Sequence, residues 1–224
     1  MKRVFLVVGH QKGALMDYLG GGRHFGVDIA YIYQSERKGL GHAILQGKKW
    51  ITSPFVVLLG DSFIQPKEEI RDIVDVHKTA MPLATLLLFE VDSPEGYGIV
   101  RLRSDGSRQV EDLMEKPSPE DAKKLTSGEK HLAITGVYVF DPKIFTYIER
   151  TPPGANGEIQ ITDALHLAIQ AGEKVIGVVM KGRYLDMGKW ETVLNIEKEL
   201  AAGADIDAQV RERDNLMKRI KGTE

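Results

Sequence analysis

The sequence predicts an α/β fold with a mostly parallel sheet, followed by a half of α+β character. Two observations carry this prediction. Over roughly the first 90 of the 224 residues, short apolar and β-branched runs alternate with stretches of helical periodicity. Hydrophobic residues make up 42% of the chain, which is enough to bury a sizeable core. Alternating strands and helices imply βαβ units, in which the crossover helix makes successive strands parallel.

Local composition predicts the elements of this first part. Residues 4–8 form a continuous apolar run, as in a strand that is buried on both faces. A helix over residues 12–19 ends at Gly20, Gly21 and Gly22, which suit a helix C-terminus and a loose turn. Further strands are expected at residues 29–33, 55–59 and 83–91, and further helices at residues 39–50 and 68–78.

The second part of the chain changes character. Residues 99–103 and 108–114 flank an Asp105-Gly106 turn, which predicts a hairpin. The later elements are expected as a helix at 119–125, a strand at 134–140, a helix opened by Pro142, strands at 175–179 and 184–186, and helix from 189 with a break at Gly203. We expect this half to lie over the carboxyl ends of the strands, where open α/β sheets bind ligands.

Composition excludes several classes of function. With 30 basic and 32 acidic residues, the net charge of −2 gives no electrostatic basis for binding nucleic acid or an anionic membrane. The absence of cysteine excludes disulfides, thiolate metal sites and cysteine nucleophiles. The apolar run at residues 1–8 is too short for a signal peptide, so we expect a cytoplasmic protein. Residues 1–200 are expected to form one domain and residues 201–224 a C-terminal helical tail.

Two aspartates follow short apolar runs that are predicted to be strands. Asp61 ends the segment FVVLLGD, and Asp186 ends YLD. A carboxylate at a strand end can hold a hard cation such as Mg²⁺ beside phosphate groups. A single aspartate in such a place is more often a turn or helix N-cap residue. Two of them together favour a shared metal site.

A charged pair, Glu115-Lys116, precedes Pro117 after the predicted hairpin. A glutamate accepts hydrogen bonds from sugar hydroxyls, and a lysine offers a point charge to a phosphate. The alternative is a surface ion pair at a turn. Gly98 and Gly136 lie at strand boundaries, where each has turn chemistry as its alternative explanation.

The segment QSERKGLGHAI, residues 34–44, joins a predicted strand to a predicted helix. Gly39 and Gly41 permit a ligand to approach the backbone closely at the helix start. The spacing is similar to the dinucleotide fingerprint, but Ile44 occupies the position that needs glycine or alanine. Nicotinamide binding is therefore disfavoured, and a helix entry without a ligand stays open.

Seven segments, taken in order, resemble the landmarks of the glucose-1-phosphate nucleotidylyltransferase family. They are QSERKGLGHAI, VVLLGDS, EGYGIV, EKPSP, AITGVYVFDP, TPPGANGEIQITDAL and YLDMGKWE. The resemblance covers residues 1 to about 200 of the chain. KGLGHA and TPPGANGEIQITDA look most like the bacterial-type UTP–glucose-1-phosphate uridylyltransferases, while the thymidylyl and guanylyl branches stay open.

This resemblance implies a Rossmann-like sheet of the nucleotide-diphospho-sugar transferase type. It implies that Gln34 and Gly39 face the nucleobase of a nucleoside triphosphate, with UTP favoured. It further implies that Asp61 and Asp186 hold Mg²⁺ across the nucleotide and sugar phosphates. The implied reaction joins the nucleotide to glucose-1-phosphate and releases pyrophosphate.

The resemblance also implies the sugar side of the site. Gly98, Glu115 and Gly136 would line the sugar, in an α+β half that binds it. Lys116 would meet the sugar phosphate and act in catalysis together with Asp61 and Asp186. The partners implied are a nucleoside triphosphate and a sugar-1-phosphate, and a homo-oligomer stays open.

One family landmark is absent from the sequence. The family opens with a strand and a glycine-rich loop of the type GGxGTRLxPxT, whose backbone amides cradle the triphosphate. Nothing of this type occurs in residues 1–224, so the fold is expected to miss its first βα unit and to leave a gap or an open edge in the sheet. Two alternatives follow: a non-catalytic nucleotide-sugar-binding or regulatory relative, and a fragment that needs a partner chain to supply the loop.

Overall fold

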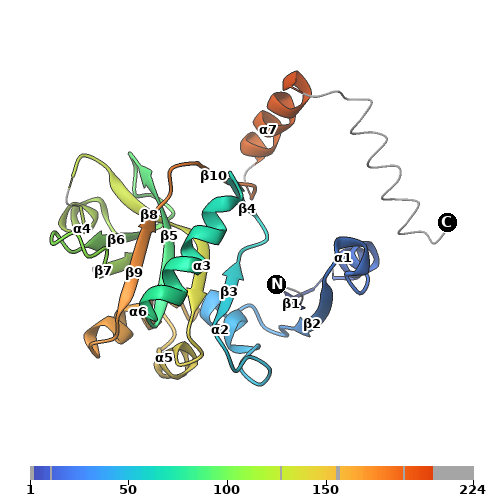
Figure 1. Cartoon of the computed structure of the whole chain (residues 1–224), viewed down its shortest axis with the longest axis horizontal. Coiled ribbons are helices and arrows are strands. Elements are labelled where there is room, and N and C mark those ends of the chain that lie inside the picture. The colour runs from blue at the N-terminus through green and yellow to red at the C-terminus, as the bar shows by residue number, and fades with distance from the viewer. Residues whose placement is uncertain (1–2, 11, 127, 155–156, 189, 204–224) are drawn as a thin grey trace. The chain divides into compact units, whose positions relative to one another are not determined.

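A computed structural model describes residues 3–10, 12–126, 128–154, 157–188 and 190–203. The chain forms two compact units, one of Met1–Glu36 with Met187–Glu224 and one of Arg37–Asp186 (Figure 1). The predicted tail at residues 201–224 lies almost wholly outside the described residues, so the domain boundary at residue 200 stays a prediction.

The larger unit is built on a six-stranded mixed sheet (Figure 1). Its strands are β3 (Phe55–Leu58), β5 (Ala84–Val91), β6 (Gly98–Leu102), β7 (Val110–Glu115), β8 (His131–Phe140) and β9 (Val175–Val179). Their order is β7-β6-β8-β5-β9, and β3 also pairs with β8. Strand β8 is antiparallel to β3 and to β5, while β9 is parallel to β5. Because β6 is antiparallel to β8 and to β7, four strands (β3, β5, β6 and β9) run in one direction and β7 and β8 in the other, and the predicted α/β class is confirmed.

Two different strands pair with the same edge of β8. β3 pairs with Val137–Phe140, and β6 pairs with Leu132 and Ala133. Gly136 lies between these two stretches, so the edge passes from β3 to β6 beside it. We refer to this change of strand partner beside Gly136 as the opening of the sheet, and the candidate site is built around it.

Helices cover both faces of this sheet. α3 (Glu68–Ala80) packs on one face, where Ile73 meets Leu87 of β5. The other face is covered by α2 (Gly39–Leu45), α5 (Ile144–Arg150) and α6 (Ile161–Gln170). Leu86 and Leu88 belong to that second core, because successive residues of a strand point to opposite faces. None of the described helices is long and apolar enough to cross a membrane.

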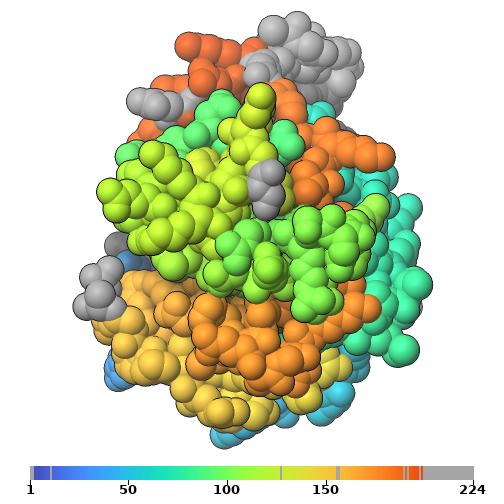
Figure 2. Space-filling view, turned by 90° about the vertical axis from the view of Figure 1, so that its left-hand side faces the viewer, coloured from blue at the N-terminus to red at the C-terminus, as the bar shows by residue number. Residues whose placement is uncertain are grey.

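The hairpin β6–β7 is followed by α4 (Pro119–Lys124), which begins at an N-cap serine, Ser118. Leu125, which directly follows α4, packs against Ile99 and Ala133 in a small third cluster. In the space-filling view the hairpin and α4, in green to yellow-green, meet α5 and α6, in yellow to orange, along a continuous surface (Figure 2).

Two further short strands pair with each other, and only one of them was predicted from the sequence. β10 (Arg183–Asp186) was expected, but its partner β4 (Ser62–Gln65) was not. They form a separate two-stranded antiparallel ribbon. The helix predicted at residues 39–50 ends at Leu45, because the chain tightens into turns there, with Lys48 N–H donating to the Leu45 carbonyl.

The smaller unit contains the N-terminal βαβ segment. β1 (Arg3–Val8) pairs in parallel with β2 (Asp28–Tyr33), and α1 (Gly13–Leu19) and a 3₁₀ turn, η1 (Arg23–Phe25), connect them. α7 (Trp190–Gly203) belongs to the same unit. These strands and α1 lie where the sequence predicted them.

Candidate functional site

The β4–β10 ribbon brings the two predicted metal ligands together. Asp186 pairs directly with Ser62, and Asp61 is the residue before Ser62. Directly opposed residues of an antiparallel pair have Cα atoms about 4.5–5.5 Å apart, so Asp61 and Asp186 are close neighbours. Both carboxylates also act on the hydroxyl of Tyr184. Burial raises the pKa of Tyr184 to about 12, and the charges of Asp186 and Asp61 add to that rise.

The hairpin places Gly98 and Glu115 side by side, because they are a register pair of β6 and β7. The Thr162 hydroxyl, at the start of α6, donates to Glu115 Oε2 at 3.1 Å. A methyl group at Gly98 would stand 3.1 Å from that same oxygen and 3.1 Å from Thr162 Cγ2. Glycine at position 98 therefore keeps the space above the carboxylate open.

Burial raises the pKa of the Glu115 carboxyl group. The hydrogen bond from Thr162 and the charge of Lys116 oppose that rise, while Asp163 and Glu158 add to it. A half-buried carboxylate with one oxygen held by a hydroxyl has its other oxygen available to accept from a ligand hydroxyl. This arrangement suits a polyhydroxylated ligand.

Lys116 follows Glu115 and has an unusual backbone. Its φ is +42°, in the left-handed region that non-glycine residues rarely adopt. The N–H of Lys116 donates to the Tyr97 carbonyl at 3.0 Å, which closes the end of the hairpin. The exposed side chain of Lys116 thus leaves a strained position directly beside Glu115, and such strain concentrates at functional sites.

Gly136 lies between the ribbon that carries Asp61 and the hairpin that carries Glu115. Its φ is +81°, and a methyl group there would meet Leu59 Cδ1 at 2.6 Å and Ser62 Oγ at 3.1 Å. The Ser62 hydroxyl donates to the Thr135 carbonyl at 2.9 Å. Ser62 therefore fastens the ribbon that carries Asp61 to the opening of the sheet at β8.

An aromatic cluster makes a second connection between the hairpin and the ribbon. The ring of Phe89 lies 5.3 Å from Tyr97 and 4.4 Å from Tyr184. Tyr97 precedes Gly98 of the hairpin, and Tyr184 lies in the ribbon. The structure thus brings together six of the predicted site residues, which are Asp61, Asp186, Gly98, Glu115, Lys116 and Gly136.

The two predicted nucleobase contacts belong to different units. Gln34 lies in the smaller unit and Gly39 in the larger one. Gly39 has φ +86°, and a methyl group there would meet the Ile159 carbonyl oxygen at 2.8 Å. Gly41 N–H donates to that same carbonyl at 2.9 Å. The glycines of this motif therefore accommodate the chain's own backbone at Ile159, which argues further against a dinucleotide fingerprint.

Thr162, Ser62 and Tyr184 contribute to this arrangement but are not among the predicted site residues. Thr162 and Glu115 are separated by 47 positions, so no local pattern links them. The landmark segment TPPGANGEIQITDAL, which contains Thr162, was the one available signal for that residue.

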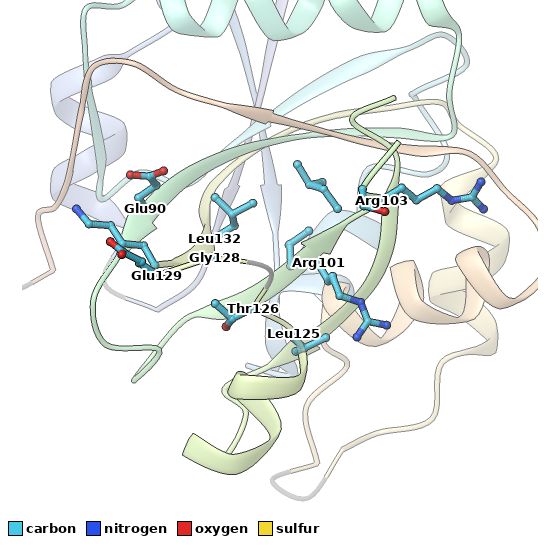
Figure 3. Close-up of a pocket in the computed structure, with 12 residues that line it drawn as sticks. Glu90, Arg101, Arg103, Leu125, Thr126, Gly128, Glu129 and Leu132 are labelled. Atoms are coloured by element: carbon cyan, nitrogen blue, oxygen red, sulfur yellow. The ribbon is translucent and has the colours of Figure 1, made fainter. Parts of the chain in front are cut away.

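Two hollows of the described surface contain none of the predicted site residues. One, of about 500 Å³, lies between β6, β8 and the segment after α4. Glu90 and Glu129 lie at one end of it, and Arg101 and Arg103 at the other (Figure 3). The other, of about 700 Å³, lies along α3 and β9. Charges of both signs line each hollow, and the convergent groups above are a stronger indication of the functional site than cavity size.

Comparison with known proteins agrees with this geometry. The sequence matches the family described as nucleotidyl transferase over residues 1–203. It is 38% identical to UTP–glucose-1-phosphate uridylyltransferase of Bacillus subtilis over 167 residues, which are 72% of this chain and 55% of that protein. It is 32% identical to glucose-1-phosphate thymidylyltransferase of Streptomyces griseus over 220 residues, which are 97% of this chain and 59% of that protein.

Solved structures extend the agreement to the fold. A UDP-glucose pyrophosphorylase complexed with UDP-glucose has a TM-score of 0.78 and 27% identity, over 91% of this chain and 82% of that one. The present chain spans somewhat more than half the length of the curated relatives named above. The resemblance inferred from the sequence motifs is confirmed, and the chain belongs to the nucleotidyl transferase family, a family of transferases.

Proposed function

We propose that the chain serves to transfer a nucleotidyl group from a nucleoside triphosphate, with UTP favoured, to glucose-1-phosphate. One observation carries the proposal. Asp61 and Asp186, at one end of the ribbon, and the Gly98–Glu115 register pair of the hairpin lie on either side of the opening of the sheet beside Gly136. A nucleotidyl transfer needs a charge-neutralising group for phosphates next to a hydroxyl-binding group for the sugar, and this opening offers both.

In the proposed reaction a phosphate oxygen of glucose-1-phosphate attacks the α-phosphorus in line. The bond between the α-phosphorus and its bridging oxygen breaks, and pyrophosphate leaves with that electron pair. Glu115 accepts hydrogen bonds from the sugar hydroxyls, and Thr162 keeps its carboxylate in place. The Lys116 ammonium group neutralises the sugar phosphate.

The donor set at the ribbon suits Mg²⁺. This ion is usually held by one or two carboxylates and completes its shell with water and phosphate oxygens. Among the described residues there is no group of three or more metal-binding side chains, so Asp61 and Asp186 fit an ion that the substrate phosphates help to bind. Mg²⁺ held there would supply charge neutralisation for the phosphates during the transfer.

The test is a pyrophosphate-release assay with Mg²⁺, glucose-1-phosphate, and UTP, dTTP or GTP in turn. We expect release with UTP above that with the other two. Release with a different nucleotide would move the proposal to another branch of the family. Parallel calorimetry with UDP-glucose and Mg²⁺ measures binding independently of turnover, and no binding would remove the proposal.

A second candidate is a chain that binds a nucleotide sugar without catalysing its formation. The observation that favours it is the Gly98–Glu115 pair of the hairpin with its Thr162 hydrogen bond, an arrangement that would serve ligand binding without any turnover. In the same experiments, UDP-glucose binding without any pyrophosphate release would favour this candidate.

A further inference from the structure

Glu69 is a buried carboxylate that the proposed reaction does not use. It is the second residue of α3, and only 8% of its surface is exposed. Its Oε1 accepts the backbone N–H of Lys181 at 2.9 Å and of Gly182 at 2.8 Å. Hydrogen bonds from amides to an ionised carboxylate are about twice as strong as neutral ones. Glu69 therefore holds the turn that connects β9 to β10.

This turn is pressed against the end of β4. A methyl group at Gly182 would clash with the Gln65 carbonyl oxygen, so the two backbones are in direct contact there. Gln65 pairs with Arg183, the first residue of β10. Through its hydrogen bonds to the turn, Glu69 thus fixes one end of the ribbon, and Asp61 and Asp186 lie at the other end.

The ribbon is tied to the main sheet near its Asp186 end by Ser62 and by Tyr184, and Glu69 holds the opposite end. The ribbon's four residue pairs are a separate two-stranded sheet in the described part of the chain. Two strands alone are marginally stable, and a slip of one residue turns every side chain to the opposite face. A slip of β10 would move Asp186 away from Asp61.

We propose that Glu69 is a positioning residue, which sets the register of β10 against β4 and thereby holds the Asp186 carboxylate beside Asp61. The part that concerns the metal rests on the proposed function. The competing explanation is that Glu69 only stabilises the N-terminus of α3 by its charge. Glu68 offers a matched control, because it lies in the same first turn and is exposed.

The first measurement is hydrogen exchange on the wild type, Glu69→Gln, Glu69→Ala and Glu68→Gln variants of the full chain. Removing a buried charged acceptor leaves two amides unpaired, so we expect exchange at residues 62–65 and 183–186 to accelerate about tenfold or more in Glu69→Ala. Glu69→Gln keeps an acceptor oxygen and should fall between, while Glu68→Gln should match the wild type. Amides of β5 and β8 should be unchanged. Acceleration spread evenly over the unit, or none at the ribbon, would overturn the proposal.

The second measurement is binding of Mn²⁺ with UDP-glucose, followed by electron paramagnetic resonance of the ion. We expect Mn²⁺ affinity to fall about tenfold in Glu69→Ala and less in Glu69→Gln, with metal-free UDP-glucose binding unchanged. A variant with a faster-exchanging ribbon and wild-type Mn²⁺ affinity would mean a merely structural role and would overturn the inference. If the wild type binds neither Mn²⁺ nor UDP-glucose, the proposed function fails, whereas the register claim is still decided by the exchange pattern.

Discussion

The two ends of the candidate site are held in different ways. At the sugar end, Glu115 is half-buried, its carboxylate is bonded to Thr162, and the hairpin that carries it belongs to the main sheet. At the metal end, Asp61 is exposed, and the ribbon that carries it is a separate pair of short strands. Glu115 is ordered by burial and a side-chain hydrogen bond, whereas Asp61 and Asp186 are placed by the strand pairing of the ribbon and by its contacts through Ser62 and Tyr184. Substitutions should therefore act locally at the first end and through the ribbon at the second.

The largest effect is expected from Asp186→Asn. The amide keeps the shape of the carboxylate but loses its charge, so phosphate neutralisation should fail while the fold persists. We expect metal-dependent pyrophosphate release to drop roughly 10²-fold or more. The exposed Asp72 on α3 gives the control Asp72→Asn, which should leave release unchanged. Full activity of Asp186→Asn would remove this residue from the site.

Glu115→Gln tests the sugar end and should change binding and stability in opposite directions. Loss of a charged acceptor should weaken glucose-1-phosphate binding by roughly 10- to 100-fold. Burial raises the pKa of Glu115 in the folded chain, so the folded state binds the proton more tightly than the unfolded state does. The fold therefore gains stability as pH falls through the raised folded pKa toward the unfolded value, whereas sugar binding is lost.

By the same reasoning, a permanently neutral side chain at position 115 should raise the free energy of unfolding at pH 7. Calorimetric titration and urea unfolding of Glu115→Gln measure the two quantities separately. A variant that binds the sugar phosphate more weakly and is also less stable would contradict the assignment of burial as the cause of the pKa shift.

Thr162→Val should have a smaller effect, because it removes only the hydroxyl that holds Glu115 Oε2. We expect KM for glucose-1-phosphate to rise by roughly 3- to 10-fold, with little change in kcat. Thr162→Ser retains the hydroxyl and should restore most of the affinity. If Thr162→Val and Thr162→Ser behave alike, packing at this position and not the hydrogen bond determines the effect.

The fold was more predictable from the sequence than the connections within the site. β5 and β8 carry long apolar runs, and their periodicity was sufficient to predict them. β4 has four residues, follows Asp61 directly, and exists because β10 pairs with it from far along the chain. Local sequence could not predict that pairing.

The other features that the sequence did not predict depend on contacts between residues far apart in the chain. Glu69 and Gly182 are 113 positions apart, so nothing near either residue indicates their hydrogen bond. The glycines at 39 and 41 were interpreted as room for a ligand, but the structure fills that room with the Ile159 backbone. A glycine pattern specifies close approach of some group, and only the fold decides which group that is.

The smallest effect is expected from replacing two residues whose backbone has a positive φ, one at the candidate site and one away from it. Met81 and Lys116 both have positive φ, at +44° and +42°. Met81 ends α3, is 82% exposed and has no part in the site, so Met81→Gly should raise the free energy of unfolding by roughly 1 kcal/mol without changing ligand binding. Lys116→Gly should relieve similar strain but lose the charge that faces the sugar phosphate. Urea unfolding paired with glucose-1-phosphate titration distinguishes them, and equal binding by the two variants would mean that the Lys116 side chain has no role in binding the sugar phosphate.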